Sequence, residues 1–72
     1  MSGFSENLRY LRLKRELTMR ALADALGFTS HSFIGDLESG RKYPSLDLAV
    51  TLADYFGVTV DQFARDELSV EE

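Results

Sequence analysis

The amino-acid sequence predicts an all-α fold, a bundle of five short helices. Five stretches place apolar residues at helical spacing, and no stretch alternates apolar and polar residues as a half-buried strand does. Three of these stretches are each followed by a glycine, where a helix C-cap is found: Gly27, Gly40 and Gly57. A chain of 72 residues is long enough for one small domain, near the lower size limit for independent folding.

The first helix is expected at about residues 4–15. Its apolar positions recur at i, i+4 and i+7 and therefore share one face: Phe4, Leu8 and Leu11. The second helix is expected to start after Thr18, whose side chain suits an N-cap, and to stop at Gly27. Its inward positions are Leu22, Ala23 and Leu26.

A third helix is expected at about residues 31–38, after a turn that starts at Gly27. Ile34 and Leu37 are three positions apart and would both face the core. Residues 39–44 are expected to form a loop, because they contain a glycine, a basic pair and a Tyr-Pro step that disfavour a helix.

The fourth helix is expected to be capped by Ser45. Its inward positions are Leu46, Ala49, Leu52, Ala53 and Phe56. The fifth helix has the clearest local signal, because Thr59 and Gln62 fit a capping box. Val58 and Phe63 stand where a hydrophobic staple would place them.

The charge of −4 is unevenly distributed. Residues 61–72 hold five of the twelve acids and one of the eight bases, so residues 1–60 balance at zero. The negative net charge therefore does not exclude nucleic acid as a partner. We expect one domain at residues 1–66 and an acidic tail at residues 67–72.

Several kinds of site are excluded by what the sequence lacks. It has no cysteine and a single histidine, so it offers no disulfide, thiolate or clustered metal site. Neither a nucleophile–base pair nor a phosphate-binding glycine loop is present. We therefore expect no enzyme, no cofactor and no metal. No apolar stretch approaches the roughly 20 residues that span a bilayer, and we expect no membrane association and a cytoplasmic location.

The second and third helices and the turn between them form a helix-turn-helix candidate. A more specific pattern surrounds it, in this order: Leu17-Thr18, Leu22-Ala23, Leu26-Gly27, Ile34, Leu37-Glu38-Ser39-Gly40, Pro44-Ser45-Leu46, Leu52-Ala53 and Phe56-Gly57-Val58. This pattern resembles the Cro/C1-type repressor family, also called the Xre family, over about residues 4–64. The resemblance implies a five-helix, lambda-repressor-like bundle whose second and third helices bind operator DNA, usually as a dimer.

The sequence departs from the family pattern in the turn. From Gly27 to Ile34 it has one residue more than the family's usual spacing. We expect the extra residue to enlarge the turn around residues 28–30. The first residue of the third helix can therefore shift by one position.

Helical periodicity places His31, Ser32 and Asp36 on the face opposite Ile34 and Leu37. The resemblance implies that these three positions read base edges in the major groove. Histidine and serine both donate and accept hydrogen bonds, whereas aspartate can accept from a cytosine amino group. Two alternatives stay open, an ordinary surface role for His31 and a solvated acid for Asp36.

DNA phosphates are expected to be contacted from the start of the second helix, from both ends of the third and from the loop after it. These residues are Thr18, Met19, Arg20, Ser30, Ser39, Arg41 and Lys42. We interpret Arg9, Lys14 and Arg15 as a solvated face. Gly35 costs roughly 1 kcal/mol inside a helix, and a close approach of its backbone to DNA is one reason to keep it.

The resemblance also implies a structural ion pair. Arg12 and Glu38 would form a partly buried pair that ties the first helix to the third. In the acidic tail, Leu68 and Val70 fit either a contact with a dimer mate or a frayed end.

These observations favour a sequence-specific regulator of transcription that binds double-stranded DNA, a repressor acting as a homodimer on a palindromic operator. The alternative is a protein-interaction module or antitoxin component on the same scaffold, with weak or autoregulatory DNA binding and a protein partner. The acidic composition and Asp36 favour this alternative, as does a third helix without arginine, asparagine or glutamine.

Overall fold

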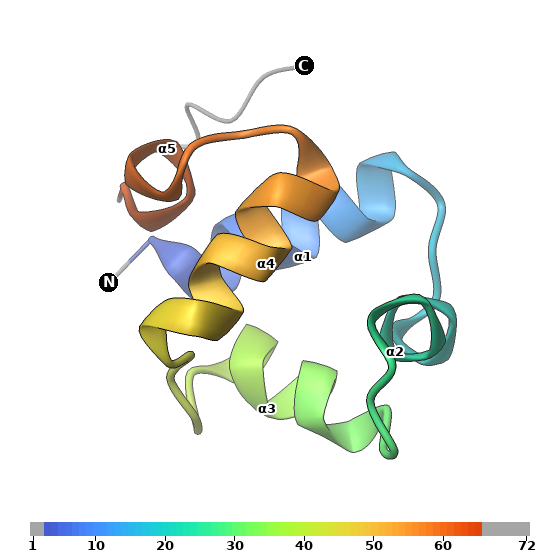
Figure 1. The fold of residues 1–72 in the computed structure, drawn as a ribbon. Helices are drawn as coiled ribbons and strands as arrows, with labels where there is room; N and C mark the ends of the chain where they lie inside the picture. Colours follow the sequence, from blue (N-terminus) through green and yellow to red (C-terminus); the bar gives the residue numbers. More distant parts are fainter. Residues whose placement is uncertain (1–2, 66–72) are drawn as a thin grey trace.

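Five helices follow one another in the computed structural model, which describes residues 3–65 (Figure 1). They are α1 (Phe4–Lys14), α2 (Met19–Leu26), α3 (Ser32–Ser39), α4 (Leu46–Phe56) and α5 (Val60–Ala64). No strand occurs within this described part of the chain. The predicted all-α fold is confirmed, whereas the acidic tail at residues 67–72, with Leu68 and Val70, lies outside the described residues.

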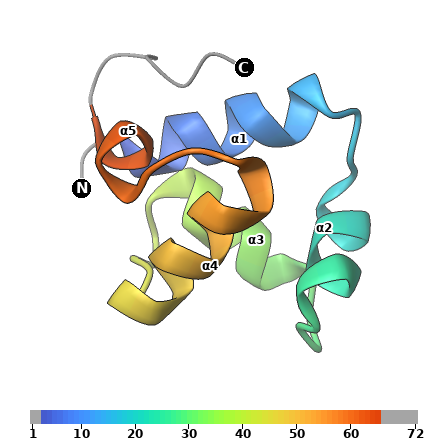
Figure 2. The same ribbon diagram turned by 45° about the horizontal axis from the view of Figure 1, so that its top comes forward.

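The helices enclose one core, in a bundle that measures 28 × 23 × 19 Å. Helix α1 packs against both α3 and α5, α2 packs against α3, and α4 packs against α5. Figures 1 and 2 show α3 along one side of the bundle, with α2 beside its first turn and the start of α4 beyond its last. This arrangement leaves the outer side of α3 uncovered by other helices.

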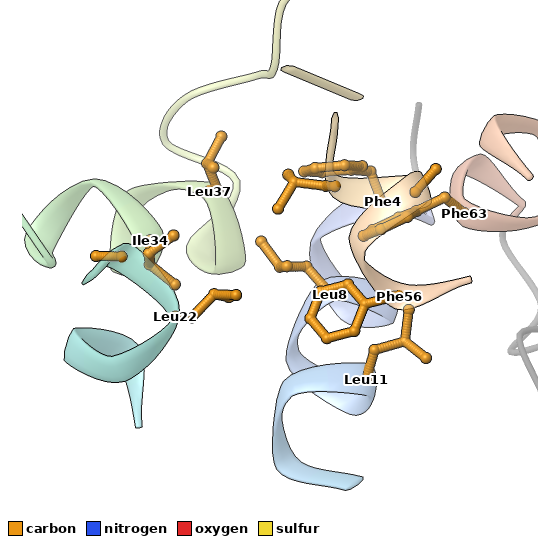
Figure 3. Packing of buried hydrophobic residues seen from close by; sticks show 11 residues of the cluster. Phe4, Leu8, Leu11, Leu22, Ile34, Leu37, Phe56 and Phe63 are labelled. Carbon is orange, nitrogen blue, oxygen red and sulfur yellow. The ribbon is translucent and has the colours of Figure 1, made fainter. Parts of the chain in front are cut away.

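Side chains from all five helices fill the core (Figure 3). The buried cluster consists of Phe4, Leu8, Leu11, Leu22, Ala23, Ile34, Leu37, Leu52, Ala53, Phe56 and Phe63. The rings of Phe4 and Phe63 stack with centroids 4.7 Å apart, and Phe56 meets Phe63 edge-on at 6.3 Å. The two ends of the domain are therefore joined by aromatic packing.

One residue predicted to face inward does not do so. Leu46 is 73% exposed, whereas Leu48 packs partly buried against the core. Leu46 is the first residue of α4, and side chains tilt toward the N-terminus of their helix. Its side chain therefore projects past the edge of the bundle although it lies near the inward face of α4.

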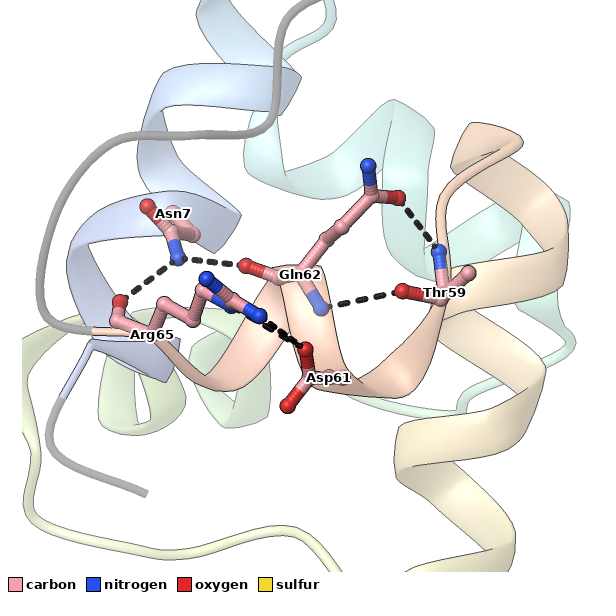
Figure 4. A network of polar contacts seen from close by, with 5 residues as sticks. All are labelled: Asn7, Thr59, Asp61, Gln62 and Arg65. Carbon is pink, nitrogen blue, oxygen red and sulfur yellow. Dashed lines mark hydrogen bonds and ion pairs between the residues drawn. The ribbon is translucent and has the colours of Figure 1, made fainter.

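The predicted N-caps are confirmed. The hydroxyls of Thr18, Ser45 and Thr59 each accept a hydrogen bond from the backbone N–H three residues later. Gln62 Oε1 accepts from the Thr59 N–H at 2.9 Å, which completes the capping box (Figure 4). These local contacts satisfy N–H groups that a helix cannot pair internally.

Helix α1 ends differently from the three helices after it. Those three end at glycines with φ between 72° and 81°: Gly27, Gly40 and Gly57. After α1 the left-handed conformation is taken by Glu16, with φ 57°. A side chain with a Cβ is strained in this region, and nothing in the sequence indicated that Glu16 would occupy it.

The third helix lies one residue later than predicted. It spans Ser32–Ser39, so Ser39 belongs to the helix and not to the following loop. The Ser32 N–H donates to Ser30 Oγ at 3.3 Å, and His31 precedes the first helical residue. His31 therefore belongs to the turn as the N-cap residue, and the helix begins at Ser32.

A buried amide fastens the start of the domain to its end. Asn7 is fully buried in α1, and its Nδ2 donates to the Phe63 carbonyl at 2.7 Å. The same nitrogen donates to the Arg65 carbonyl at 3.1 Å (Figure 4). A longer contact of 3.4 Å reaches the Gln62 carbonyl. One side chain thus satisfies the carbonyls at the C-terminal end of α5.

Candidate nucleic-acid interface

Helices α2 and α3 form a compact helix-turn-helix (Figure 2). In the turn, the Phe28 N–H donates to the Ala23 carbonyl at 2.9 Å. The Phe28 ring meets the Phe33 ring edge-on at 5.4 Å, and both pack partly buried against the core. These two rings hold the turn against α3, so their role is structural.

The orientation of α3 is set by two side chains with no exposed surface, Ile34 and Leu37. With these two buried, His31 and Ser32 are exposed where the helix begins. The Ser32 hydroxyl lies 2.7 Å from the hydroxyl of Ser30. Ser30, His31 and Ser32 thus place exposed polar side chains at the N-terminal end of α3, the end that is expected to enter the DNA groove.

Asp36 is engaged with the loop that follows α3. Its carboxylate lies 3.8 Å from Arg41 Nη1 and 3.7 Å from Lys42 Nζ. Its carbonyl accepts from the Lys42 N–H at 3.2 Å. The acid therefore lies beside two bases that offset its charge, and a base contact by Asp36 would compete with these ion pairs.

The two loop bases remain accessible despite these contacts. The side chains of Arg41 and Lys42 are 79% and 59% exposed. Lys42 Nζ lies 5.5 Å from the centre of the Phe33 ring, a cation–π contact that helps to hold the loop near α3.

The start of α2 presents a second polar edge. Thr18 uses its hydroxyl as a cap by accepting from the Ala21 N–H at 2.9 Å, and Arg20 is exposed. Met19 packs partly buried against the core. A Cβ added to Gly35 would meet Met19 Sδ at 3.5 Å, which is an ordinary contact. Packing against α2 therefore does not explain why position 35 is a glycine.

Arg12 and Glu38 lie against each other between α1 and α3. Arg12 Nε donates to Glu38 Oε2 at 2.6 Å, and Nη2 donates to Oε1 at 3.1 Å. The third nitrogen of the guanidinium donates to the Leu17 carbonyl at 2.7 Å. The ion pair expected from the resemblance is present, and it also holds the segment that leads into α2.

A groove beside this ion pair is lined by Arg9, which the sequence placed on a solvated face. Six residues from α1, α2 and α3 line an open groove of about 290 Å³: Arg9, Arg12, Met19, Gly35, Glu38 and Ser39. Because Arg12 and Glu38 form an ion pair, Arg9 leaves the lining of the groove with one net positive charge. Arg9 stands three positions before Arg12, and this helical spacing is the signal that could have linked it to the site.

The other two bases of the expected solvated face have different roles. Arg15 donates to the carbonyls of Tyr55 at 3.1 Å and Phe56 at 3.0 Å, at the C-terminal end of α4. Its guanidinium also lies 5.1 Å from the centre of the Phe56 ring. Lys14 Nζ lies 5.6 Å from the centre of the Tyr10 ring. Arg15 is thus exposed, as expected of a solvated face, and it also caps the C-terminal end of α4.

Residues 3–65 contain neither a metal-binding cluster nor a membrane-spanning helix. No group of three histidine or acidic side chains there is placed to hold a metal ion. None of the helices in this part of the chain is long and apolar enough to cross a membrane.

Comparison with known proteins assigns this arrangement to a family. A helix-turn-helix family model matches residues 8–63. The chain belongs to the Cro/C1-type helix-turn-helix family. The resemblance drawn from the sequence is thereby confirmed, and the domain is of a DNA-binding class of transcription regulators and not of an enzyme class.

Curated relatives of this helix-turn-helix domain are named as transcription regulators. The HTH-type transcriptional activator BcrR of Enterococcus faecalis is 34% identical over 89% of the chain and 31% of its own length. The cryptic phage CTXphi transcriptional repressor RstR of Vibrio cholerae is 29% identical over 96% of the chain and 62% of its own.

An uncharacterised HTH-type transcriptional regulator, MJ0272 of Methanocaldococcus jannaschii, is 39% identical over 75% of the chain and 80% of its own length. The chain spans 31% of the length of the activator BcrR and 62% of that of the phage repressor RstR, which is less than two thirds of either protein. No solved structure matches the chain.

Proposed function

We propose that the chain is a sequence-specific regulator of transcription that binds double-stranded DNA in the cytoplasm as a homodimer. The observation that carries this proposal is the exposed N-terminal end of α3, where Ser32 begins the helix and His31 immediately precedes it. Ile34 and Leu37 bury the opposite side of the same helix. A helix held in this way can enter the major groove with its N-terminal residues first.

Three side chains are proposed to contact bases: His31, Ser32 and Asp36. The first two donate and accept hydrogen bonds and therefore select a base weakly. Asp36 would accept from a cytosine amino group after releasing Arg41 or Lys42, whose contacts to it are 3.8 and 3.7 Å long. Specificity is then expected to depend partly on the shape of the operator.

The proposed phosphate contacts surround this helix on both sides. They are Thr18, Met19 and Arg20 at the start of α2, Ser30 and Ser39 at the ends of α3, and Arg41 and Lys42 in the loop. The groove that Arg9 lines adds one more base on the same side. Such contacts fix the register of the protein on DNA without reading sequence.

Repression of a palindromic operator is the mode of regulation that we propose. Repression requires only that a bound dimer blocks the polymerase, so a domain of this size is sufficient. The relatives include both the repressor RstR, which aligns with 96% of the chain, and the activator BcrR, which aligns with 89%, so the choice of repression rests on the requirement for occupancy alone.

The decisive experiment is selection of bound sites from random duplex DNA, followed by affinity measurements across a salt series. We expect one preferred palindrome with half-sites about one helical turn apart, and an affinity that falls steeply with salt. Failure to bind any duplex at low salt would contradict the proposal.

The alternative function is a protein-interaction module or antitoxin component with weak or autoregulatory DNA binding. The observation that favours it is the acid Asp36 on the outward side of α3, a helix without arginine, asparagine or glutamine. A tight complex with a protein partner, together with no selected DNA site, would support this alternative.

A further inference from the structure

The solvent-facing side of α1 carries two apolar side chains and a base. Leu13 is 52% exposed, and Tyr10, three positions earlier, is partly buried. Lys14 Nζ lies 5.6 Å from the centre of the Tyr10 ring, and Lys14 forms no ion pair with any residue in the range 3–65. We call Tyr10, Leu13 and Lys14 the outer face of α1. Figure 2 shows α1 along the upper edge of the bundle.

A buried acceptor without a partner lies beside the outer face of α1. Asn7 is fully buried, yet its Oδ1 accepts no hydrogen bond from any residue in the range 3–65. In Figure 4 this oxygen points away from the Gln62 and Arg65 carbonyls that the Asn7 nitrogen contacts. A buried acceptor that has lost its water and gained no donor is unfavourable. Asn7 stands three positions before Tyr10, so a donor that reached this oxygen would lie next to the outer face.

The described part of the chain ends at the same place. The Arg65 carbonyl accepts from Asn7 Nδ2 at 3.1 Å, so the chain leaves α5 beside Asn7. Residues 66–72 follow, and a segment of this length reaches up to about 23 Å when extended. Lys14 is seven positions after Asn7, which is roughly 10 Å along the helix axis. Residues 66–72 are therefore long enough to follow the whole outer face of α1.

The composition of this segment complements the outer face of α1. Leu68 and Val70 are two positions apart, so they share one side of an extended segment. Two glutamates follow them at residues 71–72. The last turn of α1 is basic and includes Lys14, whereas the acid of its first turn, Glu6, lies at the opposite end. A segment that runs along α1 from its first turn to its last therefore matches apolar groups with apolar groups and acids with a base.

We propose that residues 66–72 dock on the outer face of α1 and run parallel to the helix. Leu68 packs against Tyr10, and Val70 packs against Leu13. An isolated exposed leucine is ordinary on a protein surface. Leu13 differs because an acidic segment with two apolar side chains leaves the fold within reach of it.

Two other features of α1 are accounted for by the same contact. A backbone N–H at the start of the segment donates to Asn7 Oδ1, and the glutamates at residues 71–72 lie beside Lys14. Arg9 lies on another side of α1, so the docked acids stay away from the groove that Arg9 lines. The inference goes beyond the proposed function and does not depend on it.

Disulfide formation between introduced cysteines tests the contact directly, because the chain has no cysteine of its own. The full chain with Leu13→Cys and Val70→Cys is oxidised at micromolar concentration, and mass spectrometry identifies bonds within one chain. The matched control combines Val70→Cys with Glu6→Cys, an exposed position on the same helix that is closer to Asn7. Circular dichroism verifies that both variants are folded.

A docked segment and a free one give opposite results in this comparison. We expect the bond to position 13 to form several-fold faster than the bond to position 6. A free segment would reach position 6 at least as readily, because position 6 is next to the point where the segment leaves the fold. Equal rates, or a faster control, would overturn the proposal.

Thermal unfolding of the full chain tests whether the contact stabilises the domain. Leu13→Gln and the pair Leu68→Gln/Val70→Gln are each expected to lower Tm by a few degrees. Combining all three should lower Tm no further than the larger of these effects, because both changes remove one contact. Leu46→Gln replaces an exposed leucine of α4, and its effect should add to that of the pair. Additive effects of Leu13→Gln and the pair, or no effect of Leu13→Gln, would overturn the proposal.

Exchange of charges tests the direction of the segment along α1. Lys14→Glu is expected to slow formation of the bond between positions 13 and 70 several-fold, and Glu71→Lys/Glu72→Lys in the same chain should restore the rate. A rate that is not restored would overturn the proposed direction. These measurements contain no DNA, so their failure leaves the proposed function standing. A chain that selects no duplex likewise leaves this inference standing.

Discussion

Arg12 Nε lies 2.6 Å from Glu38 Oε2, and the two side chains are only 9% and 5% exposed. This pair links the first helix to the one that carries the proposed base-contacting residues. The same guanidinium also donates to the Leu17 carbonyl. One charged group therefore joins three parts of the chain: α1, the connection between α1 and α2, and α3. The position of α3 therefore depends on a contact that lies outside the helix-turn-helix itself.

Removal of one member of this pair is expected to destabilise the domain strongly. Glu38→Ala leaves a buried guanidinium without its carboxylate and should lower the free energy of unfolding by about 3–5 kcal/mol. The double variant Arg12→Met/Glu38→Met should be more stable than Glu38→Ala, because neither buried charge is then left alone. Urea denaturation measures both values. Equal losses in the single and double variants would show that the buried unpaired charge is not the cause.

The sequence predicted those features whose signals are local. The glycine C-caps, the box formed by Thr59 and Gln62, and the inward positions of α1 all follow from spacing within one helix. The Arg12–Glu38 pair, 26 positions apart, came from the family resemblance and not from spacing. Contacts between a side chain and an element far along the sequence could not be predicted in this way. The hydrogen bond from Arg15 to the Phe56 carbonyl at the end of α4 is an example.

The candidate site was predicted in outline. The outward face of α3 followed from burial of Ile34 and Leu37, but the ion pairs of Asp36 with the loop did not. The spacing of Arg9 and Arg12 on α1 could link Arg9 to the ion pair, but the groove itself requires three helices to be packed together and could not be predicted from α1 alone. The exposure of Leu46 could not be predicted either, because periodicity identifies the face of a helix and not where the neighbouring helices end.

Asn7 provides a test of a long-range contact that the sequence did not reveal. Asn7→Ala removes the donor to the Phe63 and Arg65 carbonyls, so it should lower the free energy of unfolding by about 1–3 kcal/mol. The neighbouring Glu6 is exposed, and Glu6→Ala should change stability by less than about 0.5 kcal/mol. Chemical denaturation of the two variants makes the comparison. Similar values for both would mean that the carbonyls are equally well satisfied by water.

Glu16 offers a stabilising substitution. A φ of 57° strains a residue with a Cβ by about 1–2 kcal/mol. Glycine has no Cβ and adopts this conformation without that strain. Part of this gain is lost because glycine is more flexible in the unfolded chain, so Glu16→Gly should raise stability by about 0.5–1 kcal/mol. A shift in Tm of a few degrees upward is then expected, since about 1 kcal/mol corresponds to 4–8 °C in domains of this size. Glu16→Val should shift Tm downward, because a β-branched residue tolerates positive φ poorly.

Base and phosphate contacts should respond differently to substitution. His31→Ala is expected to reduce discrimination at one or two positions of the operator, with a loss of about 1–3 kcal/mol on the preferred sequence. Arg20→Ala should weaken binding to all sequences similarly and lower the salt slope by about one. Affinities for the selected operator and for single-base variants, each across a salt series, separate the two effects. If His31→Ala lowered the affinity for all sequences equally, His31 would contact the DNA phosphate backbone and not a base.

Arg9 is expected to contact a phosphate although the sequence placed it on a solvated face. It lines the groove beside Arg12, Met19 and Ser39, on the side of the domain where the proposed backbone contacts lie. Arg9→Ala should therefore reduce affinity for every duplex and lower the salt slope by about one, without altering the preferred sequence. Lys14→Ala is the matched control, because Lys14 contacts the Tyr10 ring on another face of α1. Equal losses for the two variants would indicate a general effect of net charge, whereas a loss confined to Arg9→Ala would extend the DNA-binding surface to α1.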